Sequence, residues 1–266
     1  MTISRHILAV ACVTVAAHSS RGQMPPDAGT QPSTHSPVAT GAANDGPAPP
    51  GKSCADDEPP ADDQNAPDVD TRARDLLNRG SAAFWTGYQQ KNRALVIDAV
   101  DKLEQALKLD PRMPAAYNIL ATYYAGIKKP DTAAGLLETG IRHNPTSPIL
   151  RYTQGVVHSQ MNMPAKAIAH YQAAIDLGMK CKEGVFLNIG NAHVKIGSRP
   201  QAIDAYQQAL AANPSHHKAR RALVLVYVQD GNTAAAREHA RRLTQLDPNG
   251  EFGAWAREAL KQPELR

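Results

Sequence analysis

Histidine offers the widest choice of chemistry in this chain, because it binds metal ions and exchanges protons near neutral pH. His216 and His217 are adjacent, so on a helix their rings would point in different directions and would form a poor metal-binding pair. His158 and His193 lie 35 residues apart, and we expect both rings to pack inside the fold. The sequence shows no glycine-rich phosphate loop, no Cys-x-x-Cys pair and no nucleophile elbow. We therefore expect a protein that is not an enzyme and that uses no cofactor or metal.

Basic residues form the second group with chemical potential. The formal net charge is +4, with acids dominating residues 23–70 and bases dominating residues 71–266. Six of the bases lie close together in sequence: Lys218, Arg220, Arg221, Arg237, Arg241 and Arg242. No aromatic residues are interleaved with them in the way that nucleic-acid binding favours, so we expect no nucleic acid partner. An anionic peptide, polysaccharide or lipid headgroup is one interpretation, and a solvated surface is the other.

A small residue recurs at a fixed interval through the part of the chain that carries these groups. Alanines separated by 34, 34, 35 and 34 residues are Ala99, Ala133, Ala167, Ala202 and Ala236. Prolines follow the same period at Pro111, Pro145, Pro214 and Pro248, with Met179 at the missing place. Such a period indicates one supersecondary unit stacked several times, which is typical of a binding scaffold.

Residues 183–216 show the internal pattern of one unit. Phe186, Ile189 and Gly190 fall on one helical face, and Gly197 is expected to end that helix. A second helix is predicted from about Pro200, with small residues where the two backbones approach. The residue before a proline is disfavoured in a helix, so Asn213 and Pro214 close the unit.

These residues resemble the tetratricopeptide repeat family. Unit 114–147 supplies its signature as Tyr117, Leu120, Ala121, Tyr124, Ala133, Leu137, Gly140 and Pro145. Unit 148–182 departs from the signature at Arg151, Gln154 and Met179, and unit 217–250 departs from it at Val224 and Ala240. The resemblance implies an all-α fold, a right-handed superhelical solenoid of helix–turn–helix repeats.

The expected domain covers residues 71–262. Its five repeats are 71–113, 114–147, 148–182, 183–216 and 217–250, and an amphipathic helix over 251–262 caps the last repeat. In the first repeat, about seven extra residues around 87–93 are expected to lengthen the turn. The irregular step at Met179–Lys182 is expected to bend or loosen the stack.

The resemblance also implies a concave groove lined by the first helix of each repeat. Its predicted wall includes Asn118, Thr122, Tyr152, Val156, Leu187, Asn191, Lys195, Lys218, Arg221 and Leu225. Such a wall suits an extended peptide or a helix of another protein. Asn191, Lys218 and Arg221 resemble part of the clamp that some family members use for a terminal carboxylate, but the full set is absent. Plain exposed helix surface is the alternative interpretation of these positions.

The N-terminal region predicts export. Arg5 and His6 precede a short apolar stretch that ends in small residues, so residues 1–17 are predicted to be a signal peptide. Cys12 offers a second interpretation, a lipoprotein cleavage site, and a membrane attachment only in that case. Residues 18–70 are rich in Pro, Ala and Asp and are predicted to be a disordered linker. The sequence leaves open whether Cys54 and Cys181 pair.

Together these features predict a non-catalytic protein–protein interaction scaffold of the bacterial cell envelope, either periplasmic or secreted. The alternatives are an envelope-assembly lipoprotein for pilus or secretion-channel biogenesis and an accessory domain for polysaccharide export. The sequence does not predict the oligomeric state.

Overall fold

The computed structural model describes residues 71–265, and in this range the chain is entirely helical. Its α-helices are α2 (Thr71–Gln89), α3 (Arg93–Leu109), α4 (Pro114–Gly126), α5 (Pro130–His143), α6 (Pro148–Gln160), α7 (Pro164–Asp176), α8 (Lys182–Lys195), α9 (Arg199–Ala212), α10 (His217–Gln229), α11 (Thr233–Leu246) and α12 (Glu251–Ala259). A short 3₁₀ helix, Pro263–Leu265, follows α12. No described helix is long and apolar enough to span a bilayer.

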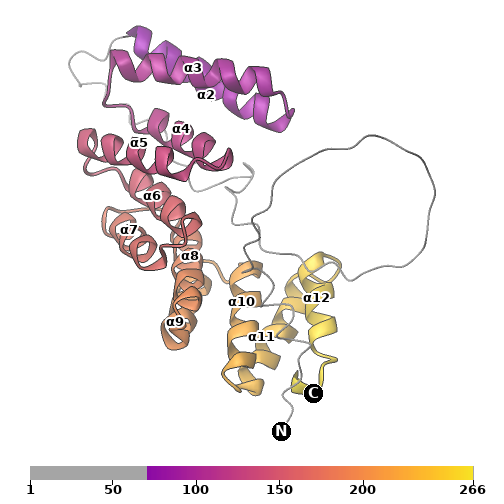
Figure 1. The fold of residues 1–266 in the computed structure, drawn as a ribbon. Helices are drawn as coiled ribbons and strands as arrows, with labels where there is room; N and C mark the ends of the chain where they lie inside the picture. The colour runs from indigo at the N-terminus through magenta and orange to yellow at the C-terminus, as the bar shows by residue number, and fades with distance from the viewer. Residues whose placement is uncertain (1–70, 266) are drawn as a thin grey trace, which may run out of the picture. The chain divides into compact units, whose positions relative to one another are not determined.

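The helices pack as antiparallel neighbours in chain order, from α2–α3 to α10–α11, as Figure 1 shows. The second helix of each pair also packs against the first helix of the next pair, and α12 packs mainly against α11. This arrangement is an all-α solenoid, as the sequence predicts. It places α4, α6, α8 and α10 as the successive first helices of the repeats that follow the first one.

A residue in the left-handed conformation separates the two helices of each pair. Gly197 (φ 78°) and Gly231 (φ 75°) adopt it without steric cost, because glycine has no Cβ. Lys128 (φ 60°) and Asn162 (φ 57°) occupy the equivalent fifteenth residue of their repeats in the same conformation. The sequence identifies Gly197 as a helix break, and the structure extends that break to every pair.

The recurring alanines hold the paired helices together. Ala99, Ala133, Ala167, Ala202 and Ala236 are all 0% exposed. Glycines serve the same purpose on the facing helices, since a Cβ on Gly155 would lie 2.6 Å from the ring of Tyr171. Close approach of two helix backbones therefore explains why a small residue recurs at this interval.

The first repeat corrects one prediction. The extra residues do not lengthen the turn: α2 continues to Gln89, and only Gln90–Asn92 separate it from α3. Gly80 and Gly87 lie seven residues apart on α2, where added Cβ atoms would meet Leu103 and Val96 at 2.9 Å. Gly87 is therefore a close-packing glycine inside a long helix, and the insertion lengthens both helices of the pair.

The irregular step at Met179–Lys182 loosens one contact of the stack, which agrees with the prediction. Gly178 turns the chain with φ 89°, Met179 is buried, and α7 still packs closely on α8. The first helices separate instead, because α6 makes less contact with α8 than α4 makes with α6. Cys181 is the N-cap residue of α8. The predicted signal peptide, the linker, Cys12 and Cys54 lie outside the described residues.

Candidate functional site

Hydrogen bonds join predicted wall residues to residues on the next first helix. The Thr153 hydroxyl of α6 donates to Asn118 Oδ1 of α4 at 2.6 Å. Asn188 Nδ2 of α8 donates to the Tyr152 hydroxyl of α6 at 3.1 Å. Each bond links the fifth residue of one repeat to the sixth residue of the next, so the same contact recurs along the stack.

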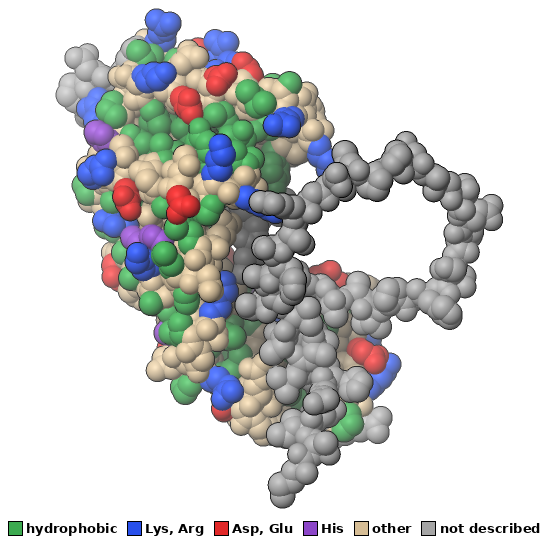
Figure 2. All heavy atoms as spheres, viewed as in Figure 1, with side chains coloured by type: hydrophobic (Ala, Val, Ile, Leu, Met, Phe, Trp, Pro, Cys, Tyr) green, Lys and Arg blue, Asp and Glu red, His purple; other side chains and the backbone are tan. Residues whose placement is uncertain are grey.

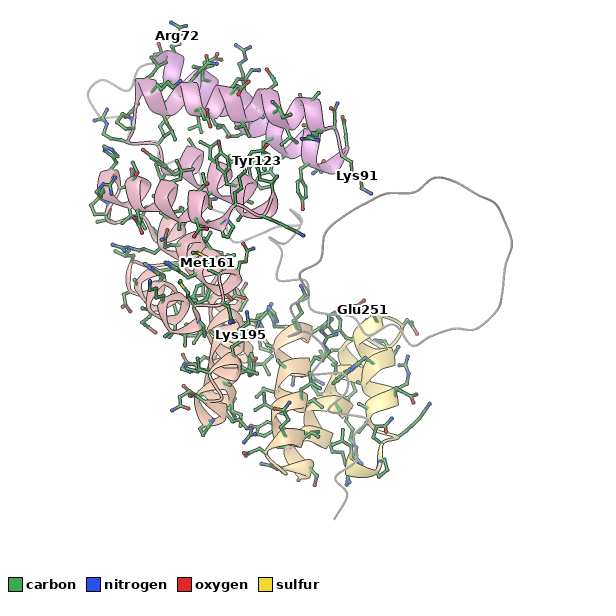
Figure 3. The ribbon with its side chains drawn as sticks, viewed as in Figure 1. Arg72, Lys91, Tyr123, Met161, Lys195 and Glu251 are labelled. Carbon is green, nitrogen blue, oxygen red and sulfur yellow. The ribbon has the colours of Figure 1, made fainter. Side chains whose placement is uncertain are left out.

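A second connection lies near the C-terminal ends of the first helices. Lys195 Nζ of α8 donates to Ser159 Oγ of α6 at 3.3 Å and to the Ser159 carbonyl at 3.4 Å. Figure 3 labels Lys195, the last residue of α8, and Met161, the residue that follows α6. These bonds join the faces of α4, α6 and α8 into one polar and apolar surface. We call this surface, together with the predicted wall residues of α10, the inner wall.

Most of the predicted wall residues are partly exposed. Lys195 and Lys218 are exposed, and the half-buried residues are Asn118, Thr122, Tyr152, Val156, Leu187, Asn191, Arg221 and Leu225. The Thr122 hydroxyl is directed back to its own helix, where it donates to the Asn118 carbonyl at 2.8 Å. The inner wall thus offers apolar side chains, amides and two lysines to a ligand.

The structure holds Asn191 and Arg221 away from a shared clamp. Asn191 Oδ1 accepts a hydrogen bond of 2.8 Å from the Tyr206 hydroxyl of α9. The Arg221 guanidinium lies over two rings of α12, 5.4 Å from the centroid of Phe252 and 5.8 Å from that of Trp255. These contacts are cation–π interactions that fix the arginine against α12. Asn191 and Arg221 are therefore committed to different neighbours.

Sequence reasoning missed several residues of this surface. Phe252 and Trp255 continue it onto α12, and Trp255 follows Arg221 by the same 34 residues that separate the repeats. This 34-residue spacing is the feature of the sequence from which they could have been predicted. Thr153 and Asn188 follow predicted wall positions directly, and only the structure shows that they join one repeat to the next.

An apolar rim borders the inner wall. The residues that cap the C-terminal ends of α4 and α8, Ile127 and Ile196, are 44% and 46% exposed. Met161 occupies the same place after α6 and is half-buried. Isolated exposed apolar residues are normal, but three at one repeat position form a row that suits contact with another protein.

Two stacked ring pairs recur on the repeats that have arginine as their fourth residue. In unit 148–182, which carries Arg151, the rings of His158 and His170 stack at 5.0 Å. In unit 217–250, Tyr227 and His239 stack at 5.7 Å in the equivalent places. His158 is buried, as the sequence predicts, and His193 is half-buried.

Burial controls the protonation of these histidines. It lowers the pKa of His170 to about 4, with further lowering by His158 and Arg151. Burial also lowers the pKa of His158 and His193, and Lys166 adds to the lowering at His158. The rings are therefore neutral near pH 7. Among residues 71–265, no three His, Cys, Asp or Glu side chains gather in a metal-binding cluster.

Each of these two units borders a hollow. The hollow beside His158 has a volume of about 420 Å³ and lies among α5, α6 and α7. The hollow beside His239 has a volume of about 440 Å³ and is formed by α10 and α11. Figure 2 shows Lys and Arg side chains scattered over the visible face rather than gathered in one patch.

The comparisons with known proteins identify the repeat. Residues 98–148 and 187–251 match the tetratricopeptide repeat family model. No curated protein sequence gave a significant match.

Solved structures share the fold at low sequence identity. The pilus biogenesis factor PilW is 19% identical to this chain. The match covers 71% of this chain and 96% of the PilW chain, with a TM-score of 0.56. YrrB, described as a protein with an unusual peptide-binding site, is 18% identical over 70% of this chain and 92% of its own, with a TM-score of 0.54. MamA is 20% identical over 66% and 96%, with a TM-score of 0.53. These structures share the fold of the helix pairs, and the family model matches residues 98–148 and 187–251 as tetratricopeptide repeats.

Proposed function

We propose that this chain is a non-catalytic scaffold of the bacterial cell envelope that binds an extended peptide or a helix of another protein along its inner wall. The observation that carries the proposal is the set of hydrogen bonds between first helices, in which Thr153 donates to Asn118, Asn188 to Tyr152 and Lys195 to Ser159. These bonds align successive repeats. A ligand that contacts one first helix therefore finds the next one in a fixed place.

The chemistry of the wall indicates the kind of partner. Val156, Leu187 and Leu225 offer partly exposed apolar area, and Lys195 and Lys218 offer positive charge. Peptides that bind such surfaces use apolar side chains as anchors and polar groups for orientation. The proposed partner therefore carries apolar residues and at least one acidic group.

Two relatives support parts of this proposal. YrrB is a repeat protein with a peptide-binding site, and PilW acts in type IV pilus biogenesis. The second relationship favours envelope assembly, for a pilus or a secretion channel, as the more specific version of the scaffold. An accessory role in polysaccharide export is the alternative. The proposed location is the periplasm or the exterior, with membrane attachment if Cys12 carries a lipid.

Site-specific photo-crosslinking in the native host tests the proposal. A photoreactive residue is placed at Val156 or Leu187 on the inner wall, and a control is placed at Gln201, which is exposed on α9. The expected result is one shared crosslinked protein from both wall positions and its absence from the control. Crosslinks from Gln201 alone, or the same products from all three positions, contradict the proposal.

A charge reversal on the wall provides an independent readout. Lys195→Glu with Lys218→Glu should weaken binding of a peptide from the crosslinked partner about tenfold or more, because two attractive contacts become repulsive. Lys108→Glu, an exposed position near the end of α3, is the matched control and should leave binding within a factor of two. Equal effects of the two changes would assign the loss to net charge rather than to the wall.

A further inference from the structure

Two aromatic side chains remain partly exposed near the C-terminal end of α2. Trp85 is half-buried and Tyr88 is 43% exposed. Both contact the ring of Phe84, which is 2% exposed. The ring centroid of Phe84 lies 5.0 Å from that of Trp85 and 6.4 Å from that of Tyr88. A residue of the hydrophobic core therefore holds both rings in place.

Tyr123 of α4 extends these rings to the second repeat. It is half-buried and packs on the same hydrophobic cluster that contains Phe84, as Trp85 does. The helices α2 and α4 also contact each other. Together, Trp85, Tyr88 and Tyr123 form what we call the aromatic surface. It lies where the first two repeats meet.

The register of the repeats places the aromatic surface on the side of the inner wall. Gly80 packs against the second helix of its pair, as Gly190 does in unit 183–216. Trp85 follows Gly80 by five residues, and the wall residue Lys195 follows Gly190 by the same five. Trp85 therefore occupies in the first repeat the place that Lys195 occupies in the fourth. Tyr88 lies one helical turn beyond Trp85.

Exposed bases follow both helices that carry the aromatic surface. Lys91 and Arg93 come directly after α2, and Lys128 and Lys129 come directly after α4. Figure 3 shows Lys91 at the end of the first helix pair. Asp131, in the first turn of α5, is an acid close to the second pair of bases. The bases therefore offer orientation and a modest attraction, while the rings offer most of the contact area.

The chain that leads into α2 has a sequence that matches this surface. Residues 56–63, which lie outside the described residues, are Asp-Asp-Glu-Pro-Pro-Ala-Asp-Asp. We call them the acidic proline segment. Proline restricts the backbone to conformations close to the polyproline II helix. Segments of this kind dock on aromatic side chains with little loss of entropy. The prolines thus match the rings, and the acids on either side match the bases after α2 and α4.

The connection between the acidic proline segment and α2 is long enough for docking. Residues 61–70 separate Pro60 from Thr71, where α2 begins. This stretch can span about 33 Å when extended. Along α2, at 1.5 Å per residue, Trp85 and Tyr88 lie about 21 Å and 26 Å from Thr71. The chain can therefore run back beside α2 and bring its two prolines to both rings.

We propose that the acidic proline segment docks on the aromatic surface of its own chain. Pro59 and Pro60 pack against Trp85 and Tyr88, and the flanking acids face the bases that follow α2 and α4. None of the three aromatic residues is among the predicted wall residues, so the docking does not depend on the binding of another protein to the inner wall.

Acrylamide quenching of Trp85 fluorescence in the full chain tests the docking. The chain has two tryptophans, so Trp255→Phe leaves Trp85 as the single fluorophore. This substitution keeps an aromatic ring beside Arg221, and the variant serves as the reference for all others. In the reference protein, the docked segment should shield the indole of Trp85 from the quencher.

Substitutions of prolines separate docking from a general effect of the region. Pro59→Gly with Pro60→Gly should raise the quenching constant about twofold or more, because the indole loses its cover. Pro49→Gly with Pro50→Gly is the matched control, since this pair of prolines has no acid directly beside it. It should leave the quenching constant unchanged. A peptide of residues 55–64 should restore the shielding when it is added to the Pro59→Gly, Pro60→Gly variant.

Substitutions of bases test the other half of the contact. Lys91→Glu with Lys128→Glu should also raise the quenching constant, because like charges would face the acids of the segment. Lys108→Glu, an exposed position near the other end of the first helix pair, is the matched control and should not raise it. All three lysines are exposed, so the variants are expected to fold, and circular dichroism checks this.

Protein concentration distinguishes the chain's own segment from that of a second copy. Docking within one chain predicts a quenching constant that is the same over a hundredfold range of concentration, since the tether fixes the effective concentration. Shielding that appears only at high concentration would assign the surface to a second copy and overturn the proposal. The proposal is also overturned if Pro59→Gly with Pro60→Gly leaves quenching unchanged, or if the control pair raises it as much.

Discussion

Units 148–182 and 183–216 share the packing of their two helices and differ on one side of the pair. Both have a glycine as their eighth residue against a tyrosine as their twenty-fourth, as Gly155 against Tyr171 and Gly190 against Tyr206. Their fourth and twenty-third residues differ: the first unit has Arg151 and His170, whereas the second has Phe186 and Ala205.

The difference separates two kinds of residue in a repeat. The glycine–tyrosine contact sets how closely the helices approach and is kept in both units. The fourth position tolerates a change from an apolar side chain to arginine, and the twenty-third tolerates a change to a neutral histidine. The hollows lie beside the units that carry arginine and histidine at these positions. The stack thus keeps its helix spacing while it varies the chemistry beside individual pairs.

The shared feature predicts the largest effect on stability. Gly190→Ala places a Cβ against the ring of Tyr206, and Gly155→Ala places one 2.6 Å from Tyr171. Each should lower the free energy of unfolding by up to about 3 kcal/mol, because overpacking a close contact forces the helices apart. Denaturant titration measures the change.

Gly135→Ala is the matched control for these substitutions. Gly135 lies inside α5 with no atom within 4 Å of an added Cβ. This change should raise the free energy of unfolding by about 0.5–1 kcal/mol, because alanine favours a helix. If all three substitutions stabilise the protein, the close approach of the helices is refuted.

The differing feature predicts a smaller, pH-dependent effect. The pKa of His170 lies at about 4 in the folded chain, below its ordinary value of 6.5. The unfolded chain therefore binds more protons between these values, and the free energy of unfolding decreases as pH falls. From pH 7 to pH 5, His170 should contribute a loss of about 2 kcal/mol.

His170→Gln removes that contribution and tests the difference between the two units directly. Denaturant titrations at pH 7 and pH 5 should show that the variant loses about 2 kcal/mol less than the wild type. A pH dependence identical to that of the wild type would show that His170 titrates alike in the folded and unfolded chains.

The sequence predicts most of the fold because the features that decide it are local and periodic. Every alanine of the 34-residue pattern is fully buried, and the helix pairs follow the same period. Gly87 misled the prediction of the first turn because glycine both ends helices and allows close packing. Only the distance to Val96 distinguishes the two roles.

Unit 217–250 shows why side-chain packing is harder to predict. Val224 and Ala240 each depart from the residue type that the family pattern has at that position, yet they are 1% and 0% exposed. The larger residue stands at the eighth position and the smaller at the twenty-fourth, the reverse of Gly190 and Tyr206. When each residue of this repeat is compared with the family pattern separately, the repeat departs from the pattern at both positions. The exchange of the large and the small side chain nevertheless conserves the total volume that the two side chains fill.

The candidate site was only partly accessible to sequence reasoning. Repeat positions predict which residues line the inner wall, but they do not predict that Arg221 lies over the rings of Phe252 and Trp255. They also do not predict the hollow beside Arg220. Side chains of α10 and α11 form this hollow, and one of these side chains, Arg220, is buried.

Hydrogen exchange measured with and without a peptide from the crosslinked partner tests the central claim, that the partner binds the inner wall, most directly. The account predicts slower exchange of backbone amides in the first helices α4, α6 and α8, with little change in the second helices α5, α7 and α9. Protection confined to the second helices, or spread equally over both, would contradict it.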